Sequence, residues 1–355
     1  MKLLVTGGAG FIGGNFIGYW LKHHPEDQIV CLDKLTYAGH LSTVLSAFRS
    51  PAFRFVKGDI ADREGVERLF AREKFSLVVN FAAESHVDRS ILDPRVFTVT
   101  NVLGAQTLMD ACLKYGCRFH QVSTDEVYGD LPLTRKDLSF TESSPLRPSG
   151  PYSASKAAAD LLALAYFRTY GLPVTVTRSS NNYGAYQYPE KLIPLAIVKA
   201  LRGQPVPVYG DGSNVRDWLF AEDHCRAIEA VLQRGKAGNV YNAGAGEEHS
   251  NLEVVRAILK ELGKDEGKIV FTEDRKGHDL RYSLDCTKIT GECGWRPRKG
   301  FREGLAETVR WYLENRAWWE PFVQGGTAQK RNKICLHYLF TLPRHGSRKI
   351  AAAPN

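Results

Sequence analysis

The chain has 355 residues, of which 43% are hydrophobic, so it is long enough for one large domain and a smaller one. Its net charge of +8 includes six lysines and arginines after Phe322, where no Asp or Glu occurs; residues 1–322 carry only +2, which predicts no nucleic-acid partner. No run of about twenty apolar residues occurs, and residues 1–6 form a strand pattern, so we expect no membrane span, no signal peptide and a cytoplasmic protein.

Short β-rich segments alternate with helical patterns through the first half of the chain. We expect strands at residues 2–6, 28–33, 53–58, 77–82, 119–124 and 174–178. Residues 77–82 are apolar on both faces, as strands are when helices cover both sides of a parallel sheet. The sequence therefore predicts an α/β fold, with a Rossmann doubly wound parallel sheet over residues 1–180.

The second half of the chain is richer in Pro and Gly and has shorter candidate elements, a helix at 251–262 and a strand at 269–273. We expect a smaller C-terminal α/β substrate-binding domain at 181–321, with part of 215–245 returning to the first domain. Residues 322–355 form an atypical basic tail, to which we assign no function. Ligands of doubly wound folds bind beyond the carboxyl ends of the strands, so we expect a cleft between the two domains.

A glycine-rich turn at residues 7–13 joins the first expected strand to a helical segment. Its glycines at 8, 10 and 13 fit the pattern that admits a pyrophosphate to a helix N-terminus. A turn that binds nothing is the alternative. Asp33 ends the second strand, where a carboxylate accepts hydrogen bonds from ribose hydroxyls and repels a 2′-phosphate, so we predict NAD rather than NADP. Lys34 opposes this preference, while Asp59 and Ile60 are placed to border adenine.

Three polar residues, Thr124, Asp125 and Glu126, follow an expected strand directly and should face the cofactor cleft. Two neighbouring carboxylates in one cleft can hold opposite protonation states, one as acid and one as base. Tyr152 and Lys156 are four apart on a helix, where the ammonium can lower the phenol pKa and allow an alcohol to be oxidised. A solvated acidic loop and an ordinary surface Tyr–Lys pair are the alternatives.

These motifs together resemble the extended short-chain dehydrogenase/reductase family and, within it, the sugar-nucleotide 4,6-dehydratases that act on dTDP-glucose. The likeness covers about residues 1–321. Beyond the motifs above it rests on residues 33–39, 82–88, 123–129, 181–184, 191–194 and 215–218. Lys276 departs from it, because the family usually has proline there.

The resemblance implies roles for individual residues. Tyr152 would take the sugar 4-hydroxyl proton during oxidation, Glu126 the C5 proton, and Asp125 would protonate the departing C6 hydroxyl, with Thr124 bonded to the C4 oxygen. Residues expected around NAD are Gly7, Gly10, Phe11, Ile12, Gly13, Asp33, Lys34, Leu35, Thr36, Asp59, Ile60, Ala82, Ala83, Thr100, Tyr152, Lys156 and Asn182. Residues expected around the sugar nucleotide are Ser85, Thr124, Asn181, Lys191, Leu192, Pro207, Val208, Tyr209, Arg216, Asn251, Arg275, His278 and Asp279. A homodimer is also implied.

Other functions stay open at this point. An epimerase, a decarboxylase or a GDP-mannose dehydratase is a rival, although the Asp125-Glu126 pair argues against each. A non-catalytic NAD sensor is a rival of another class, but such proteins often lose the Tyr or Lys that this chain keeps. The seven cysteines contain no Cys-x-x-Cys pair, and His86 and His278 show no ligand spacing with a carboxylate, so we expect no disulfide framework and no metal site.

Overall fold

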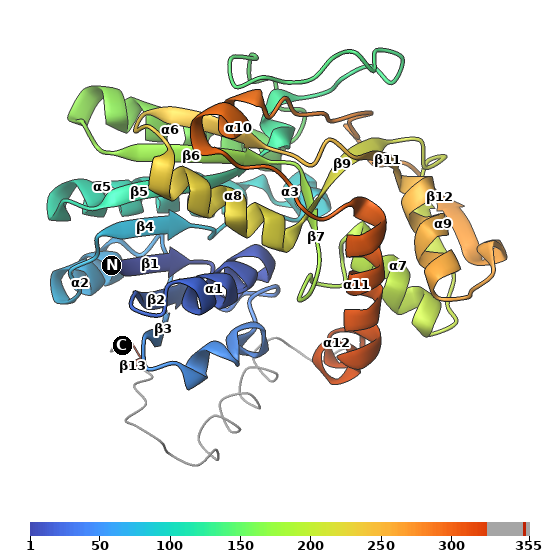
Figure 1. Cartoon of the computed structure of the whole chain (residues 1–355), viewed down its shortest axis with the longest axis horizontal. Helices are drawn as coiled ribbons and strands as arrows, with labels where there is room; N and C mark the ends of the chain where they lie inside the picture. Colours follow the sequence, from blue (N-terminus) through green and yellow to red (C-terminus); the bar gives the residue numbers. More distant parts are fainter. Residues whose placement is uncertain (325–350, 353–355) are drawn as a thin grey trace.

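A computed structural model describes residues 1–324 and 351–352 (Figure 1). Its main sheet has the strand order β10-β6-β5-β4-β1-β2-β3-β13, and every neighbouring pair is parallel. The strands are β1 (Lys2–Thr6), β2 (Gln28–Asp33), β3 (Phe53–Lys57), β4 (Leu77–Asn80), β5 (Arg118–Thr124), β6 (Val174–Ser179), β10 (Asn239–Ala243) and the two-residue β13 (Ala351–Ala352). The predicted doubly wound parallel sheet is confirmed, and the six predicted strands match to within two residues at each end.

Helices cover both faces of this sheet, so successive residues of its central strands are buried on both sides. Helices α1 (Phe11–His23) and α8 (Ala221–Arg234) pack on one face and lie in front of the sheet in Figure 1. Helices α2 (Arg63–Arg72), α5 (Ala105–Tyr115) and α6 (Pro151–Tyr170) pack on the other. The carboxyl ends of β1, β2, β4 and β5 therefore meet at one open edge.

A smaller lobe stands beyond that edge, at the right of Figure 1. It contains the sheet β11-β9-β7 and the pair β12-β8. Its elements are β7 (Asn181–Tyr183), α7 (Leu192–Leu201), β8 (Val206–Tyr209), β9 (Val215–Phe220), β11 (Glu248–Ser250), α9 (Asn251–Glu261), β12 (Ile269–Thr272), α11 (Phe301–Glu314) and α12 (Arg316–Val323). Helix α10 (Thr287–Cys293) instead packs with α8 and β10. Domain boundaries at 180 and 321 stay a prediction, and most of the basic tail lies outside the described residues.

One helical run was not anticipated from the sequence. After α3 (Val87–Leu92), the short α4 (Pro94–Phe97) continues through a π-helical stretch, η3 (Thr98–Gly104), into α5. By length and composition, the run from residue 94 to 115 is the one helix among the described residues that is apolar enough to cross a membrane. This is weak evidence, because α5 is packed into the core between α2 and α6. Short 3-10 turns occupy Leu41–Val44, Ala47–Arg49, Asp125–Tyr128 and Glu266–Lys268.

Candidate active site

A cavity of about 990 Å³ lies at the carboxyl ends of the strands and is lined by residues of both lobes. All but two of the predicted site residues line it. The exceptions are Leu35 and Val208. Leu35 has a left-handed backbone (φ 57°) and packs against the core beneath α1, and Val208 is 1% exposed in the core of the smaller lobe. Their side chains therefore do not line the cavity, and a ligand contact at either residue stays a prediction for the backbone alone.

In the glycine turn, neighbouring backbone atoms lie so close to two of the glycines that no side chain fits there. Gly7 has φ +64°, and a Cβ there would lie 2.6 Å from the backbone nitrogen of Ala82. A Cβ on Gly13 would lie 2.5 Å from the carbonyl oxygen of Gly7. Helix α1 begins within this segment, at Phe11, and includes Gly13, so its N-terminal residues border the cavity. This turn fits the pyrophosphate of a dinucleotide.

The acidic residue at the end of β2 is fixed by backbone amides. Asp33 accepts hydrogen bonds from Ala9 N (2.9 Å) and Leu35 N (2.7 Å). Burial nevertheless raises the pKa of this carboxyl above its usual value. Lys34 points its ammonium to Asp59, 2.6 Å away. The cation that opposed an NAD preference in the sequence is therefore paired with a carboxylate, and Asp33 faces the cavity in a fixed orientation.

The two neighbouring carboxyls, Asp125 and Glu126, begin the 3-10 turn η4 (Asp125–Tyr128) after β5. Asp125 is 1% exposed, and its Oδ2 has no hydrogen-bond partner among the described residues. Burial first, then the charges of Glu126 and Asp217, raises its pKa well above the usual range. Burial also raises the pKa of Glu126, but the nearby Lys191 and Arg216 oppose this. The environments thus favour a neutral Asp125 beside an ionisable Glu126.

The tyrosine and lysine of the predicted pair both line the cavity from the first turns of α6. Lys156 donates to the carbonyl oxygen of Val122 (2.6 Å), and burial lowers its pKa to about 8. The pKa of Tyr152 is raised well above 10 by burial and by the charges of Glu126 and Asp125, against a hydrogen bond with Thr124. Our expectation that the ammonium lowers this pKa is therefore wrong for the ligand-free site.

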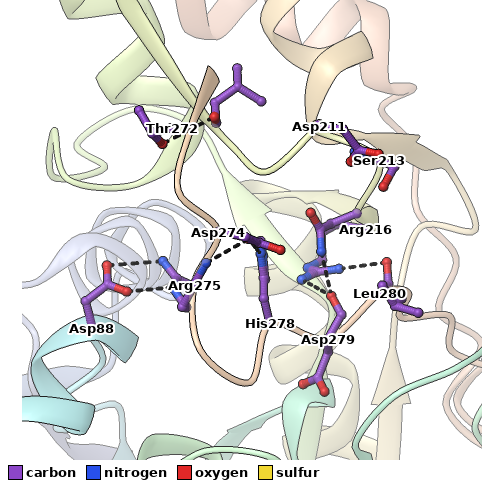
Figure 2. A network of polar contacts seen from close by, with 12 residues as sticks. Asp88, Asp211, Ser213, Arg216, Thr272, Asp274, Arg275, His278, Asp279 and Leu280 are labelled. Atoms are coloured by element: carbon purple, nitrogen blue, oxygen red, sulfur yellow. Dashed lines mark hydrogen bonds and ion pairs between the residues drawn. The ribbon is translucent and has the colours of Figure 1, made fainter. Parts of the chain in front are cut away.

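Basic residues from the smaller lobe line the same cavity as Asp125, Glu126 and Tyr152. Lys191 donates to the carbonyl oxygen of Ser85 (2.8 Å). Arg216 is held by carbonyl oxygens, among them Asp279 O (2.8 Å), and lies 4.3 Å from the centre of the Tyr282 ring. A second arginine of the cavity, Arg275, lies on the loop that follows β12, and in Figure 2 His278 stands between the two arginines. Two guanidinium groups and an ammonium suit a strongly anionic ligand.

Some residues of the cavity were missed in the sequence. Tyr282 donates to Asp279 Oδ2 (2.5 Å), and Asp88 pairs with Arg275. Asp88 lay within one of the motifs that carried the family resemblance, but nothing in its spacing linked it to a residue so far along the chain. Tyr282 stood in no motif. Only the folded loops bring these residues to the cavity.

The two histidines of the cavity make ordinary polar contacts. His278 Nδ1 lies 2.7 Å from Asp274 Oδ1, and His86 Nε2 lies 3.5 Å from Glu190 Oε2. Among the described residues, the one group with metal-ligand geometry is His24, Glu26 and Asp27, and these do not line the cavity.

The sequence of this chain is similar to those of known sugar-nucleotide dehydratases. Residues 4–308 match the family described as GDP-mannose 4,6 dehydratase. The dTDP-glucose 4,6-dehydratase of Actinoplanes sp. is 50% identical over 325 residues, 90% of this chain and 100% of the relative. That of Streptomyces griseus is 52% identical, covering 92% and 98%.

Solved structures give the same picture. The dTDP-glucose 4,6-dehydratase DesIV of Streptomyces venezuelae, crystallised with NAD, has a TM-score of 0.87 at 52% identity, covering 91% of this chain and 100% of that one. The UDP-glucose 4-epimerase of Thermus thermophilus, also with NAD, has a TM-score of 0.82 at 33% identity, covering 89% and 100%.

Proposed function

The chain belongs to the GDP-mannose 4,6-dehydratase family, and on this premise we propose that it is an NAD-dependent dTDP-glucose 4,6-dehydratase. The observation that carries the proposal is the pair of Asp125, which is buried, and Glu126, which is half-buried; both line the cavity that also contains Tyr152, the glycine turn and Asp33. Elimination of water needs both a proton donor and a proton acceptor, and this pair provides one of each.

The residues that would hold NAD are the glycine turn, which admits the pyrophosphate, and Asp33, which accepts from the ribose. When bound, NAD supplies the hydride acceptor and donor that let the sugar be oxidised at C4 and reduced at C6 without net consumption. The remaining steps are proton transfers by side chains of this chain.

Those transfers divide among three residues. Tyr152, in its phenolate form, takes the proton of the C4 hydroxyl as the alcohol becomes a ketone. The ketone makes the C5 proton acidic, so Glu126 removes it, and Glu126 returns a proton to C5 when C6 is reduced. Asp125, neutral because it is buried, gives its proton to the C6 hydroxyl, which leaves as water. Because a neutral Asp125 carries no charge, one of the two carboxylate charges that raise the pKa of Tyr152 is absent when the reaction begins, which favours the phenolate.

The smaller lobe would bind the nucleotide part of the substrate. Arg216 and Arg275 suit its diphosphate. Tyr209, whose side chain is 42% exposed on β8, suits packing against the base. Asn251, at the first turn of α9, and Asn181 complete the polar lining.

An epimerase is the nearest rival, because the Thermus thermophilus UDP-glucose 4-epimerase shares the fold. The test is incubation of the purified protein with dTDP-glucose, UDP-glucose and GDP-mannose, with product masses measured. We expect loss of one water from dTDP-glucose, and faster than from the other two. Conversion to an isomer of unchanged mass would favour an epimerase, and no conversion of any sugar nucleotide would favour an NAD sensor.

We also propose that the protein is a homodimer. Four apolar side chains are exposed on neighbouring helical segments: Val99 and Leu103 on η3, Leu113 on α5 and Leu161 on α6. Burying them against a second copy would explain why the run from residue 94 to 115 is so apolar. Light scattering on the wild type and on Leu103→Glu tests this, and a monomeric wild type would contradict it. A cytoplasmic location and the lack of a nucleic-acid partner stay predictions.

A further inference from the structure

The loop between β12 and α10 carries one ion pair to the larger lobe among the described residues, at Arg275. Hydrogen bonds join the same loop to that lobe further along, at Asp279 (from Ser149 Oγ, 2.6 Å) and at Leu280 (to Asp130 Oδ1, 2.6 Å). Arg275 on this loop donates from Nε to Asp88 Oδ1 (2.5 Å) and from Nη2 to Asp88 Oδ2 (3.2 Å). Asp88 lies in the first turn of α3, so the pair joins the two lobes at the cavity (Figure 2). The guanidinium also lies 5.2 Å from the centre of the Tyr209 ring.

The two arginines of the cavity are held in different ways. Arg216 donates to neutral carbonyl oxygens, of Val215, Asp279 and Leu280. A carbonyl leaves the positive charge of the arginine uncompensated, so Arg216 can attract an anion without giving up its partners. Arg275 faces a carboxylate with two of its nitrogens, which is also the geometry in which a guanidinium binds phosphate. The same nitrogens cannot serve both anions fully.

Resting on the proposed function, we propose that Asp88 is a specificity-determining residue that competes with the diphosphate of the substrate for Arg275. Without a diphosphate, Asp88 holds the Arg275 part of the loop of residues 273–280 against α3. A ligand with a diphosphate takes over Arg275 and releases Asp88. The Asp88 side chain is already 36% exposed, so water can solvate its carboxylate when it is released. A nucleoside without phosphate has no charge with which to displace it, so the pair selects for a diphosphate.

The first test concerns the loop and needs no substrate. Hydrogen exchange of the amides in residues 273–280 is measured in the ligand-free, NAD-containing protein for the wild type, Asp88→Asn and Asp93→Asn. Asp93 is exposed between α3 and α4, so its replacement makes the same change of charge on the same segment. We expect faster exchange in Asp88→Asn alone. Exchange in Asp88→Asn equal to that of the wild type would overturn the proposal.

The second test measures affinity by calorimetry, with dTDP, inorganic pyrophosphate and thymidine as ligands. Since exposed ion pairs are weak and charge-assisted pairs stronger, Asp88→Asn should bind dTDP and pyrophosphate about three- to tenfold more tightly. Asp93→Asn should match the wild type, thymidine should show no gain, and Asp88→Asn should have no effect when added to Arg275→Gln. Equal or weaker binding of both phosphate ligands by Asp88→Asn would refute the competition. Tighter binding of pyrophosphate with no binding of dTDP would support it and refute the proposed substrate instead.

Discussion

Replacing Asp125 by asparagine should stop the reaction after the first oxidation. The side chain is 1% exposed, and burial raises its pKa, so it is neutral and able to donate a proton. Asparagine keeps the size of the group and can still accept from Thr124 Oγ1, which lies 3.2 Å from Asp125 Oδ1. It cannot supply the proton that the departing hydroxyl needs.

The expected size of this effect follows from general acid catalysis. Loss of a positioned acid slows a step by about 10²- to 10⁴-fold, or about 3 to 5 kcal/mol of barrier. The amide also places an N–H group where Asp125 Oδ2 has no partner among the described residues, which costs about 1 to 3 kcal/mol of stability if no partner is found. The melting temperature of the variant must therefore be recorded, so that lost stability is not mistaken for lost chemistry.

A single-turnover experiment with dTDP-glucose separates the steps. Absorbance follows the reduced cofactor, and mass spectrometry follows loss of water. Asp125→Asn should accumulate reduced cofactor with undehydrated sugar, whereas Tyr152→Phe should form reduced cofactor slowly, because the C4 hydroxyl proton has no acceptor. Asp93→Asn serves as the charge-matched control. If Asp125→Asn dehydrated the sugar at the wild-type rate, the carboxyl would be a bystander, and an epimerase-like function would replace ours.

Three further outcomes are expected. Denaturing the purified protein should release NAD rather than NADP, and Asp33→Asn should weaken that preference because it removes the charge that repels a 2′-phosphate; release of NADP by the wild type would contradict the role of Asp33. Burial lowers the pKa of His120 to about 3, below its ordinary 6.5, so between these pH values the unfolded chain binds more protons than the folded one, and the free energy of unfolding falls as pH falls. Urea titrations should therefore show a smaller loss of unfolding free energy between pH 7 and pH 5 in His120→Gln than in the wild type, by about 1.4 kcal/mol per pH unit at most. Equal losses in the two proteins would refute this. Removing residues 325–355 should leave the rate of dTDP-glucose dehydration largely unchanged, because every assigned site residue precedes them. A large loss of activity in a truncated protein that still folds would show that this segment has a role.

The main sheet and the cofactor end of the cavity were predictable because their causes are local. Residues 77–79 are apolar at every position, a pattern that favours a short strand covered by helices on both sides. The glycines at 7 and 13 mark a backbone that approaches another backbone too closely for any side chain. Such constraints can be read directly from neighbouring residues.

Other features depend on distant parts of the chain and had no local signal. Tyr152 and Lys156 share a helical face as their spacing requires, but burial and the two carboxylates of η4 raise the phenol pKa. Arg275 and Asp88 are far apart in the sequence and meet only because the smaller lobe closes on the larger. Val208 lies on β8 between Pro207 and Tyr209, which both line the cavity, but its own side chain turns into the core because strand residues alternate.

The chain returns to the main sheet at β10, so this sheet can be completed only after much of the smaller lobe has been synthesised. Strand β6 ends at Ser179, but its outer edge is paired only by residues 239–243, which come after β7, α7, β8 and β9 of the smaller lobe. A nascent chain that has just emerged past residue 180 therefore exposes the unpaired edge of a strand that is buried in the folded protein, a place where other chains can pair. The nucleotide-binding half cannot be finished on the ribosome before much of its neighbour has been made. A protease that cuts between β6 and β10 would not free two complete parts, and the two lobes should unfold together.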